Sequence, residues 1–122
     1  MPISEDVRRF VVARIPSVAH LEALLLLRST GTPWPLQELS ARLYLSTTHV
    51  EALVDDLQAR ELAVRDGECA RYLPKNETLA QAVDALSAAY GKRLVDVTRL
   101  IHSMMEKKAH RFADAFNVRK DR

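Results

Sequence analysis

Apolar residues recur at helical spacing along most of the chain, and small polar residues that can cap helices separate the repeats. Ser4 precedes the first repeat, and Pro16 prevents its continuation because a residue before proline disfavours helical geometry. Ser17 precedes the second repeat, residues 18–28, in which four unbroken leucines indicate burial on more than one side. We therefore predict an N-terminal helix of about ten residues, followed by a central core helix.

Two shorter helices are predicted between Trp34 and Arg60. Trp34 is interpreted as a packing residue that leads into a helix over 36–43, where leucines recur at spacings of three and four. Ser46 can then cap a helix over 46–60, whose apolar stripe faces the core. That stripe consists of Val50, Leu53, Val54 and Leu57. The faces left to solvent carry Thr47, Thr48, His49, Glu51, Asp55 and Gln58.

The pattern changes after Arg60, where residues 62–73 are typical of two strands joined by a tight turn. Asp66 and Gly67 stand at the centre of this segment, and such a pair favours a turn that requires positive φ. Pro74 ends the second strand because proline has no amide to donate. The segment predicts a β-hairpin.

Two apolar stripes follow, with Asn76 as the N-cap of the first and Gly91 as a possible bend between them. The second stripe includes Leu94, Val97, Ile101, Met104 and Met105. A continuous apolar stripe is unfavourable on a monomer surface, so we predict a homodimer that forms through these five residues. The alternative is that these helices fold back and complete the chain's own core.

The elements together predict a mainly α fold with a small β-hairpin. The N-terminal helix occupies residues 1–16, the central unit residues 17–75, the C-terminal helices residues 76–116 and a frayed polar tail residues 117–122. At 122 residues and 48% apolar content, the chain can bury one core.

Residues 18–74 resemble the bacterial winged helix-turn-helix transcription regulators of the MarR-like and PadR-like kind. Residues 21–74 carry the resemblance, with the sequence LEALLLLRSTGTPWPLQELSARLYLSTTHVEALVDDLQARELAVRDGECARYLP. The resemblance makes residues 36–43 a scaffold helix, residues 46–60 a recognition helix and residues 62–73 a wing. It implies a regulator that binds double-stranded DNA, with contacts to bases or phosphates from Arg42, Thr47, Thr48, His49, Arg60, Arg65 and Arg71.

The charge distribution supports an alternative function. Residues 46–61 contain four acidic residues and one arginine, a net charge of −3, whereas a helix in a DNA groove normally carries basic side chains. A winged helix of this charge could instead bind a basic protein surface. The whole chain has a formal net charge of +2, divided into −3 for residues 1–91 and +5 for residues 92–122. The basic C-terminal residues are interpreted as solvated surface, with attraction of nucleic acid as the minority interpretation.

Other functional classes have little support in the sequence. We find no phosphate-binding loop, no nucleophile elbow and no paired metal-ligand motif, and we expect neither an enzyme nor a cofactor. His102, Glu106 and His110 recur every fourth residue, but the outer histidines are about 12 Å apart on one helix, too far for one metal ion. Cys69 is the single cysteine, without a resolving partner for redox sensing.

No charged leader followed by an apolar run opens the sequence, and the run of four leucines at 24–27 is far shorter than the roughly 20 residues that span a bilayer. We therefore expect a cytoplasmic protein without membrane insertion.

Overall fold

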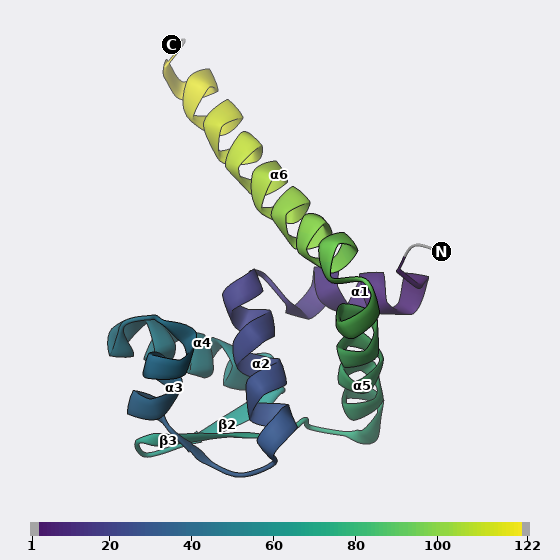
Figure 1. Cartoon of the computed structure of the whole chain (residues 1–122). Helices are drawn as coiled ribbons and strands as arrows, with labels where there is room; N and C mark the ends of the chain where they lie inside the picture. Colours follow the sequence, from purple (N-terminus) through teal and green to yellow (C-terminus); the bar gives the residue numbers. More distant parts are fainter. Residues whose placement is uncertain (1–2, 121–122) are drawn as a thin grey trace.

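The computed structural model describes the backbone of residues 3–120 and the side chains of residues 3–111. Within these residues the chain is mainly helical with a small antiparallel sheet, in agreement with the predicted fold class (Figure 1). The elements follow in the order α1 (Glu5–Arg14), α2 (Val18–Thr30), β1 (Trp34–Pro35), α3 (Leu36–Leu43), α4 (Thr47–Ala59), β2 (Ala63–Asp66), β3 (Cys69–Tyr72), α5 (Glu77–Lys92) and α6 (Leu94–Lys120).

The capping residues that the sequence indicates begin four of the helices. Ser4, Ser17, Ser46 and Asn76 each accept a hydrogen bond from a backbone amide in the following turn, at 2.9–3.3 Å. These bonds satisfy amides that have no partner within the helix, which is why the helices start at these positions. The predicted starts of α1, α2, α4 and α5 are therefore confirmed.

The sheet has the strand order β1-β3-β2, with every pairing antiparallel. Strand β1, only two residues long, pairs with β3 and was not predicted, because so short a strand has no periodicity of its own. Asp66 pairs with Cys69, so Gly67 and Glu68 form the loop, one residue later than the sequence indicated. Gly67 has φ +62°, which confirms that the turn requires positive φ.

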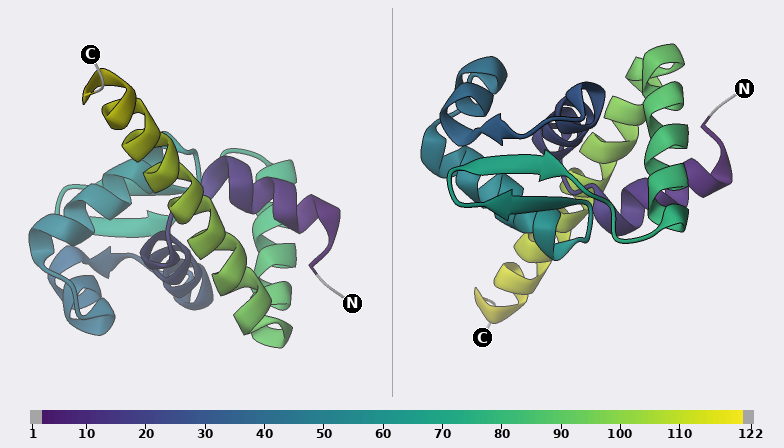
Figure 2. Two further views of the ribbon diagram at one scale, coloured as in Figure 1. Left: turned by 90° about the horizontal axis from the view of Figure 1, so that it is seen from above. Right: turned by 90° about the horizontal axis from the view of Figure 1, so that it is seen from below.

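Helix α2 lies at the centre of the molecule, as predicted. It contacts α3, α4, β3 and α6, and it buries Leu21, Leu24 and Leu27 completely. Seen from below in Figure 2, the sheet forms an outer layer in front of α2 and α4. The core continues through Val50, Leu57 and Leu62, so α4 and the hairpin are fixed to the same apolar centre.

Helix α6 begins directly after α5, because Arg93 leaves the helical conformation at φ −133°, ψ 46°. Its N-terminal half packs on α1, α2 and α5, and its C-terminal half stands clear of the other elements (Figure 1). The backbone of α6 is helical to Lys120. Residues 121–122 lie outside the described part of the chain.

Candidate functional site

The outward face of α4 is set by its core contacts. Val50, Leu53, Val54 and Leu57 are buried, which turns the opposite side of the helix toward solvent. Tyr44, in the connection from α3, has φ 57° and ψ 40°, and this left-handed residue redirects the chain into α4. Its side chain is 93% exposed. Sequence reasoning missed Tyr44 as a surface residue, since an aromatic at left-handed φ is uncommon outside special turns.

The predicted DNA-contacting residues near the start of α4 lie on the surface. Thr47, Thr48 and His49 are exposed in the first turn of the helix, and Arg42 is exposed in the last turn of α3. Together with Tyr44 they form one exposed cluster at the α3–α4 connection. These side chains could reach a ligand that approaches the N-terminus of α4.

The outward face of α4 carries acidic side chains. With a rotation of 100° per residue, Thr48 and Asp55 lie near the middle of the exposed stripe, and the half-buried Glu51 lies at its edge. Arg65 of β2 lies over this stripe, with guanidinium nitrogens 3.3 Å from Asp55 Oδ1 and 3.9 Å from Glu51 Oε1. The Arg65 amide also donates to Gln58 Oε1 at 2.7 Å. Arg65, predicted to contact DNA, therefore holds the hairpin against α4 in this structure.

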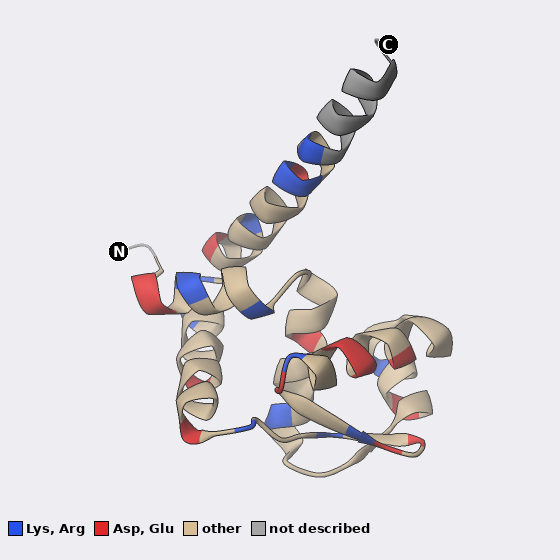
Figure 3. Cartoon of the chain, turned by 180° about the vertical axis from the view of Figure 1, so that it is seen from behind, with Lys and Arg blue, Asp and Glu red and all other residues tan. Residues whose placement is uncertain are grey.

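The tip of the hairpin adds negative charge to the same region. Asp66 and Glu68 are exposed beside Gly67, and Arg71 is exposed on β3. We call the surface formed by Glu51, Asp55, Arg65 and the tip residues Asp66 and Glu68 the α4–hairpin face. Four carboxylates against one arginine give this face a net charge of −3. Arg71 pairs with Val64 in the ladder, so its side chain lies on the opposite side of the hairpin from Arg65. Figure 3 shows acidic positions along α4 and at the hairpin tip, apart from the basic positions of α1 and α6.

Arg60, also predicted to contact DNA, points away from this face. Its Nε donates to Asp56 Oδ2 at 2.9 Å, and one terminal nitrogen donates to the Ala13 carbonyl at 3.4 Å. The Arg60 carbonyl accepts a hydrogen bond from Arg14. Arg60 thus ties the end of α4 to α1. Of the four predicted arginines, only Arg42 and Arg71 have no ion-pair partner within 4.0 Å among the described side chains.

A hydrogen-bonded chain joins α2 to α4 beside Arg60. His20 Nε2 lies 2.7 Å from Asp56 Oδ2, and His20 Nδ1 lies 2.6 Å from Ser17 Oγ. The neutral tautomer with its proton on Nε2 suits both contacts, because it donates to Asp56 and accepts from Ser17. Ser17 Oγ also accepts the His20 amide at 3.2 Å as the N-cap of α2. The hydrogen bonds that join Ser17, His20 and Asp56 are therefore explained by the capping of α2 and by the packing of α2 on α4.

The pKa values of this cluster reflect its partial burial. Burial lowers the pKa of His20 below its ordinary 6.5, and the opposing hydrogen bond and charge of Asp56 do not restore it. Burial acts to raise the pKa of Asp56, but hydrogen bonds and charge from Arg60 and His20 outweigh this effect and lower it. The cluster favours neutral His20 beside ionised Asp56. Sequence reasoning could not pair residues 36 positions apart.

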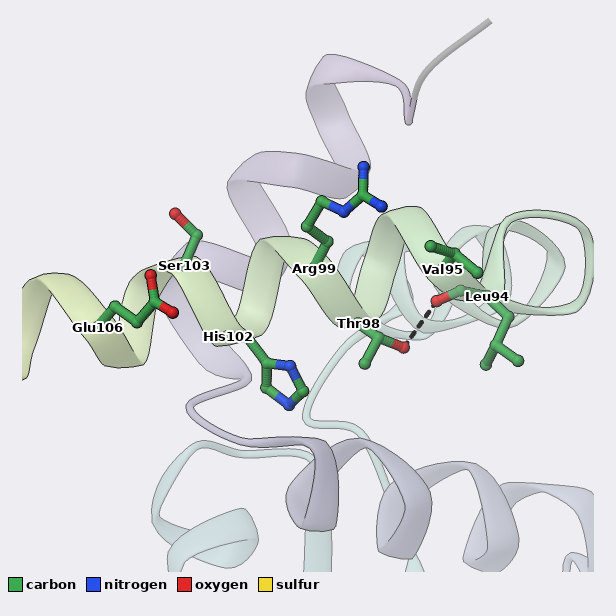
Figure 4. A pocket seen from close by; sticks show the side chains of 7 residues that line it. All are labelled: Leu94, Val95, Thr98, Arg99, His102, Ser103 and Glu106. Atoms are coloured by element: carbon green, nitrogen blue, oxygen red, sulfur yellow. Dashed lines mark hydrogen bonds between the residues drawn. The ribbon is translucent and has the colours of Figure 1, made fainter.

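The predicted dimerisation residues divide between core and surface. Val97 and Ile101 are fully buried within their own chain, which corrects their assignment to an exposed stripe. The physical reason is that α6 folds back on α1, α2 and α5, as in the alternative that the sequence left open. Leu94 and Met105 are 51% and 46% exposed, and Met104 is partly buried. Figure 4 shows seven side chains along the outer face of α6, which include Leu94, Val95, Arg99 and Glu106.

Among the described side chains, residues 3–111, no group of three or more His, Cys, Asp or Glu is placed to hold a metal ion. Cys69 is partly buried and lines a shallow pocket with Pro33, Asp66 and Arg71. Lys107, Lys108 and Arg111 are exposed on α6, whereas the side chains of Arg119 and Lys120 lie outside the described residues. In the described chain no single helix is both long and apolar enough to cross a bilayer.

Comparisons with protein-family models, curated proteins and solved structures found no match to this chain.

Proposed function

We propose that residues 17–75 form a winged helix-turn-helix with α4 as its exposed recognition helix and the β2–β3 hairpin as its wing. The proposal is supported by the element order from α2 to β3, by the strand order β1-β3-β2 and by the hairpin lying beside α4. In this arrangement α3 packs against α4. The outward side of α4 and the hairpin tip then form the binding surface.

We further propose that this winged helix is a protein interaction module whose α4–hairpin face binds a basic surface of a partner protein. The observation that carries the proposal is the acidic outward side of α4, where Asp55 is exposed and Glu51 is half-buried beside it. A groove of double-stranded DNA presents one phosphate charge per roughly 1.7 Å of axis, so a face of net negative charge is repelled. A lysine- or arginine-rich protein surface is attracted to the same face.

A DNA-binding transcriptional regulator is the second candidate. It is favoured by the exposed cluster at the α3–α4 connection, in which Thr47, Thr48 and His49 stand at the N-terminal end of α4. Recognition helices commonly contact base edges from that end. Arg42 and Arg71 would neutralise phosphates in this candidate, and Arg65 and Arg60 would first have to leave their carboxylate partners.

Selection from a randomised double-stranded oligonucleotide pool at near-physiological salt distinguishes the two candidates. The interaction module should enrich no motif and should bind DNA only at low salt. The same protein, panned against a random peptide library, should enrich lysine- and arginine-rich peptides. Enrichment of a DNA motif that is lost on Thr48→Ala would overturn the interaction module in favour of the regulator.

Charge reversal tests which face binds the basic peptides. Glu51→Lys with Asp55→Lys should abolish peptide binding, because it replaces two of the four carboxylates of the face with positive charges. Glu22→Lys with Glu77→Lys is the matched control, since both glutamates are exposed on other helices. Equal loss of binding in the two double variants would show that only net charge matters, and the α4–hairpin face would be the wrong assignment.

We also retain the homodimer as a proposal, on the outer face of α6 in Figure 4. An antiparallel pair of α6 helices related by a two-fold axis between His102 and Ser103 would place Arg99 opposite Glu106 of the second copy. Sedimentation at micromolar concentration should detect the dimer. Glu106→Arg should weaken it, and Arg99→Glu combined with Glu106→Arg should restore it. A wild type that sediments as a monomer would remove this proposal.

A further inference from the structure

A groove of about 550 Å³ runs between α1 and the middle of α6. Its floor is apolar: Val12 of α1 is 54% exposed, and Leu100 and Met104 of α6 are partly buried beside it. Leu100 and Met104 are spaced by four residues, so they lie on one side of α6. Val12, Leu100 and Met104 together form an apolar strip. No other part of the described chain covers this strip, so it contacts solvent.

The rim of this groove is strongly basic. Five cationic side chains line it, two from α1 and three from α6: Arg8, Arg9, Lys107, Lys108 and Arg111. Glu5 is the one acidic lining residue, and it lies 3.8 Å from Arg9 as an exposed pair. A smaller hollow continues the groove past Leu100 and adds Arg99 and Asp96, of which Asp96 lies 3.8 Å from Arg93. The groove therefore has an excess of positive charge along its whole length.

The spacing of the lining residues matches a helix as the occupant. From Leu100 to Arg111 the groove follows α6 for about 16 Å at 1.5 Å per residue, the length of a helix of about three turns. A helix that lies in such a groove contacts it through apolar residues at i, i+3, i+4 and i+7. The flanks of that helix would face the cationic rim, so acidic residues on the flanks are complementary to it.

We propose that the α1–α6 groove binds an acidic amphipathic helix of a partner protein, with apolar anchors on Val12, Leu100 and Met104 and carboxylates toward the rim. A second copy of this chain fits less well. Two-fold packing of one groove on another would bring Lys107, Lys108 and Arg111 of each copy into the same basic region, and like charges repel. Nucleic acid would pair with the rim but would leave the apolar floor unused. This proposal does not depend on the α4–hairpin face.

A fluorescent 18-residue peptide is the probe, with leucines at i, i+3, i+4 and i+7 and glutamates on both flanks. Fluorescence anisotropy should show saturable binding to the full-length wild type that weakens as salt is raised. A peptide of identical composition with scrambled order should bind at least about tenfold more weakly, because it cannot present one apolar side to the floor. Equal affinity for the ordered and scrambled peptides would overturn the helix as occupant.

Two comparisons, each between a variant in the groove and a matched variant outside it, test where the peptide binds. Arg8→Glu with Arg111→Glu should weaken the ordered peptide by roughly tenfold or more, since both charges flank the groove. Arg42→Glu with Arg71→Glu makes the same charge change on exposed residues elsewhere and should have a much smaller effect. Val12→Ser should weaken binding by about fivefold through loss of apolar contact, whereas Val95→Ser, at a valine 61% exposed outside the groove, should not.

The remaining outcomes identify other occupants and overturn the proposal. If duplex DNA binds through Arg8 and Arg111 as tightly as the peptide, and Val12→Ser changes neither affinity, the groove is an anion-binding surface. If the wild type is a dimer that Val12→Ser converts to a monomer, the occupant is a second copy. All variants are surface substitutions, and circular dichroism establishes that each is folded before its affinity is compared.

Discussion

The α4–hairpin face and the α1–α6 groove are both exposed surfaces of one small chain, yet they differ in charge and in shape. The α4–hairpin face is acidic, and two of its carboxylates, Glu51 and Asp55, already contact Arg65 of the same chain. The α1–α6 groove is basic, and its floor offers apolar contact area through Val12. The formal net charge of +2 therefore conceals two surfaces of opposite sign, and we propose that they bind different partners.

The two surfaces also differ in what fixes them. The α4–hairpin face rests on the central core around α2, on the α4 N-cap and on the hairpin turn. The groove depends on the packing of α6 against α1, which is anchored by the buried Val97 and Ile101. Substitutions that act on one anchor should therefore affect one surface before the other, and four measurements exploit this difference.

The largest effect is expected from Ile101→Glu. It places a carboxylate at a fully buried position, which costs about 3–5 kcal/mol when no partner is present. Met105→Glu is the control, because that side chain is 46% exposed. Urea unfolding should show a large loss for Ile101→Glu and little change for Met105→Glu. Equal stability of the two variants would contradict the packing of α6 on the core.

Gly67→Ala should weaken the hairpin and the α4–hairpin face selectively. At φ +62° an added Cβ meets nothing within 4 Å, so the cost of about 1 kcal/mol comes from the left-handed backbone alone. Gly91→Ala, in α5, is a control of opposite sign, since alanine in a helix is favoured over glycine by up to about 1 kcal/mol. Thermal unfolding should show a lower melting temperature than the wild type for Gly67→Ala and a higher one for Gly91→Ala. Stabilisation by Gly67→Ala would exclude the positive-φ turn.

Acidification should destabilise the link between α2 and α4. Burial holds the pKa of His20 below 6.5 in the folded chain, so the unfolded chain binds more protons below that pH. The contribution of His20 is complete above about pH 6.5 and decreases as the pH falls through its folded pKa. Stability measured from pH 7.5 to 5 should decline less in His20→Gln than in the wild type. His102→Gln, on the exposed part of α6, should retain the wild-type profile.

The smallest effect on stability is expected from Arg65→Ala. Exposed ion pairs contribute about 0.2–1 kcal/mol, so the loss should stay below about 1 kcal/mol. The substitution leaves Asp55 and Glu51 without their arginine and makes the α4–hairpin face more negative. Binding of the enriched basic peptides should become tighter and more salt-dependent. Arg71→Ala is the control of equal charge, and weaker peptide binding by Arg65→Ala alone would mean that Arg65 belongs to the binding surface in another role.

The sequence by itself determined the helices and the hairpin turn. Ser4, Ser17, Ser46 and Asn76 cap the helices through amides one turn away, and Gly67 adopts positive φ where the turn requires it. These features could be predicted because their causes lie within a few residues of each other in the chain. The exposed positions of Thr47, Thr48 and His49 follow from the apolar stripe of α4 for the same local reason.

Only the tertiary structure decided which distant groups meet and which apolar residues are covered. Arg65 forms its ion pairs with Glu51 and Asp55 of α4, and His20 pairs with Asp56 across 36 positions. Val97 and Ile101 lie in the core although they share a stripe with the exposed Leu94 and Met105. Periodicity shows which residues share a side of a helix, but burial depends on where that helix packs, and this is set by contacts between segments far apart in the sequence.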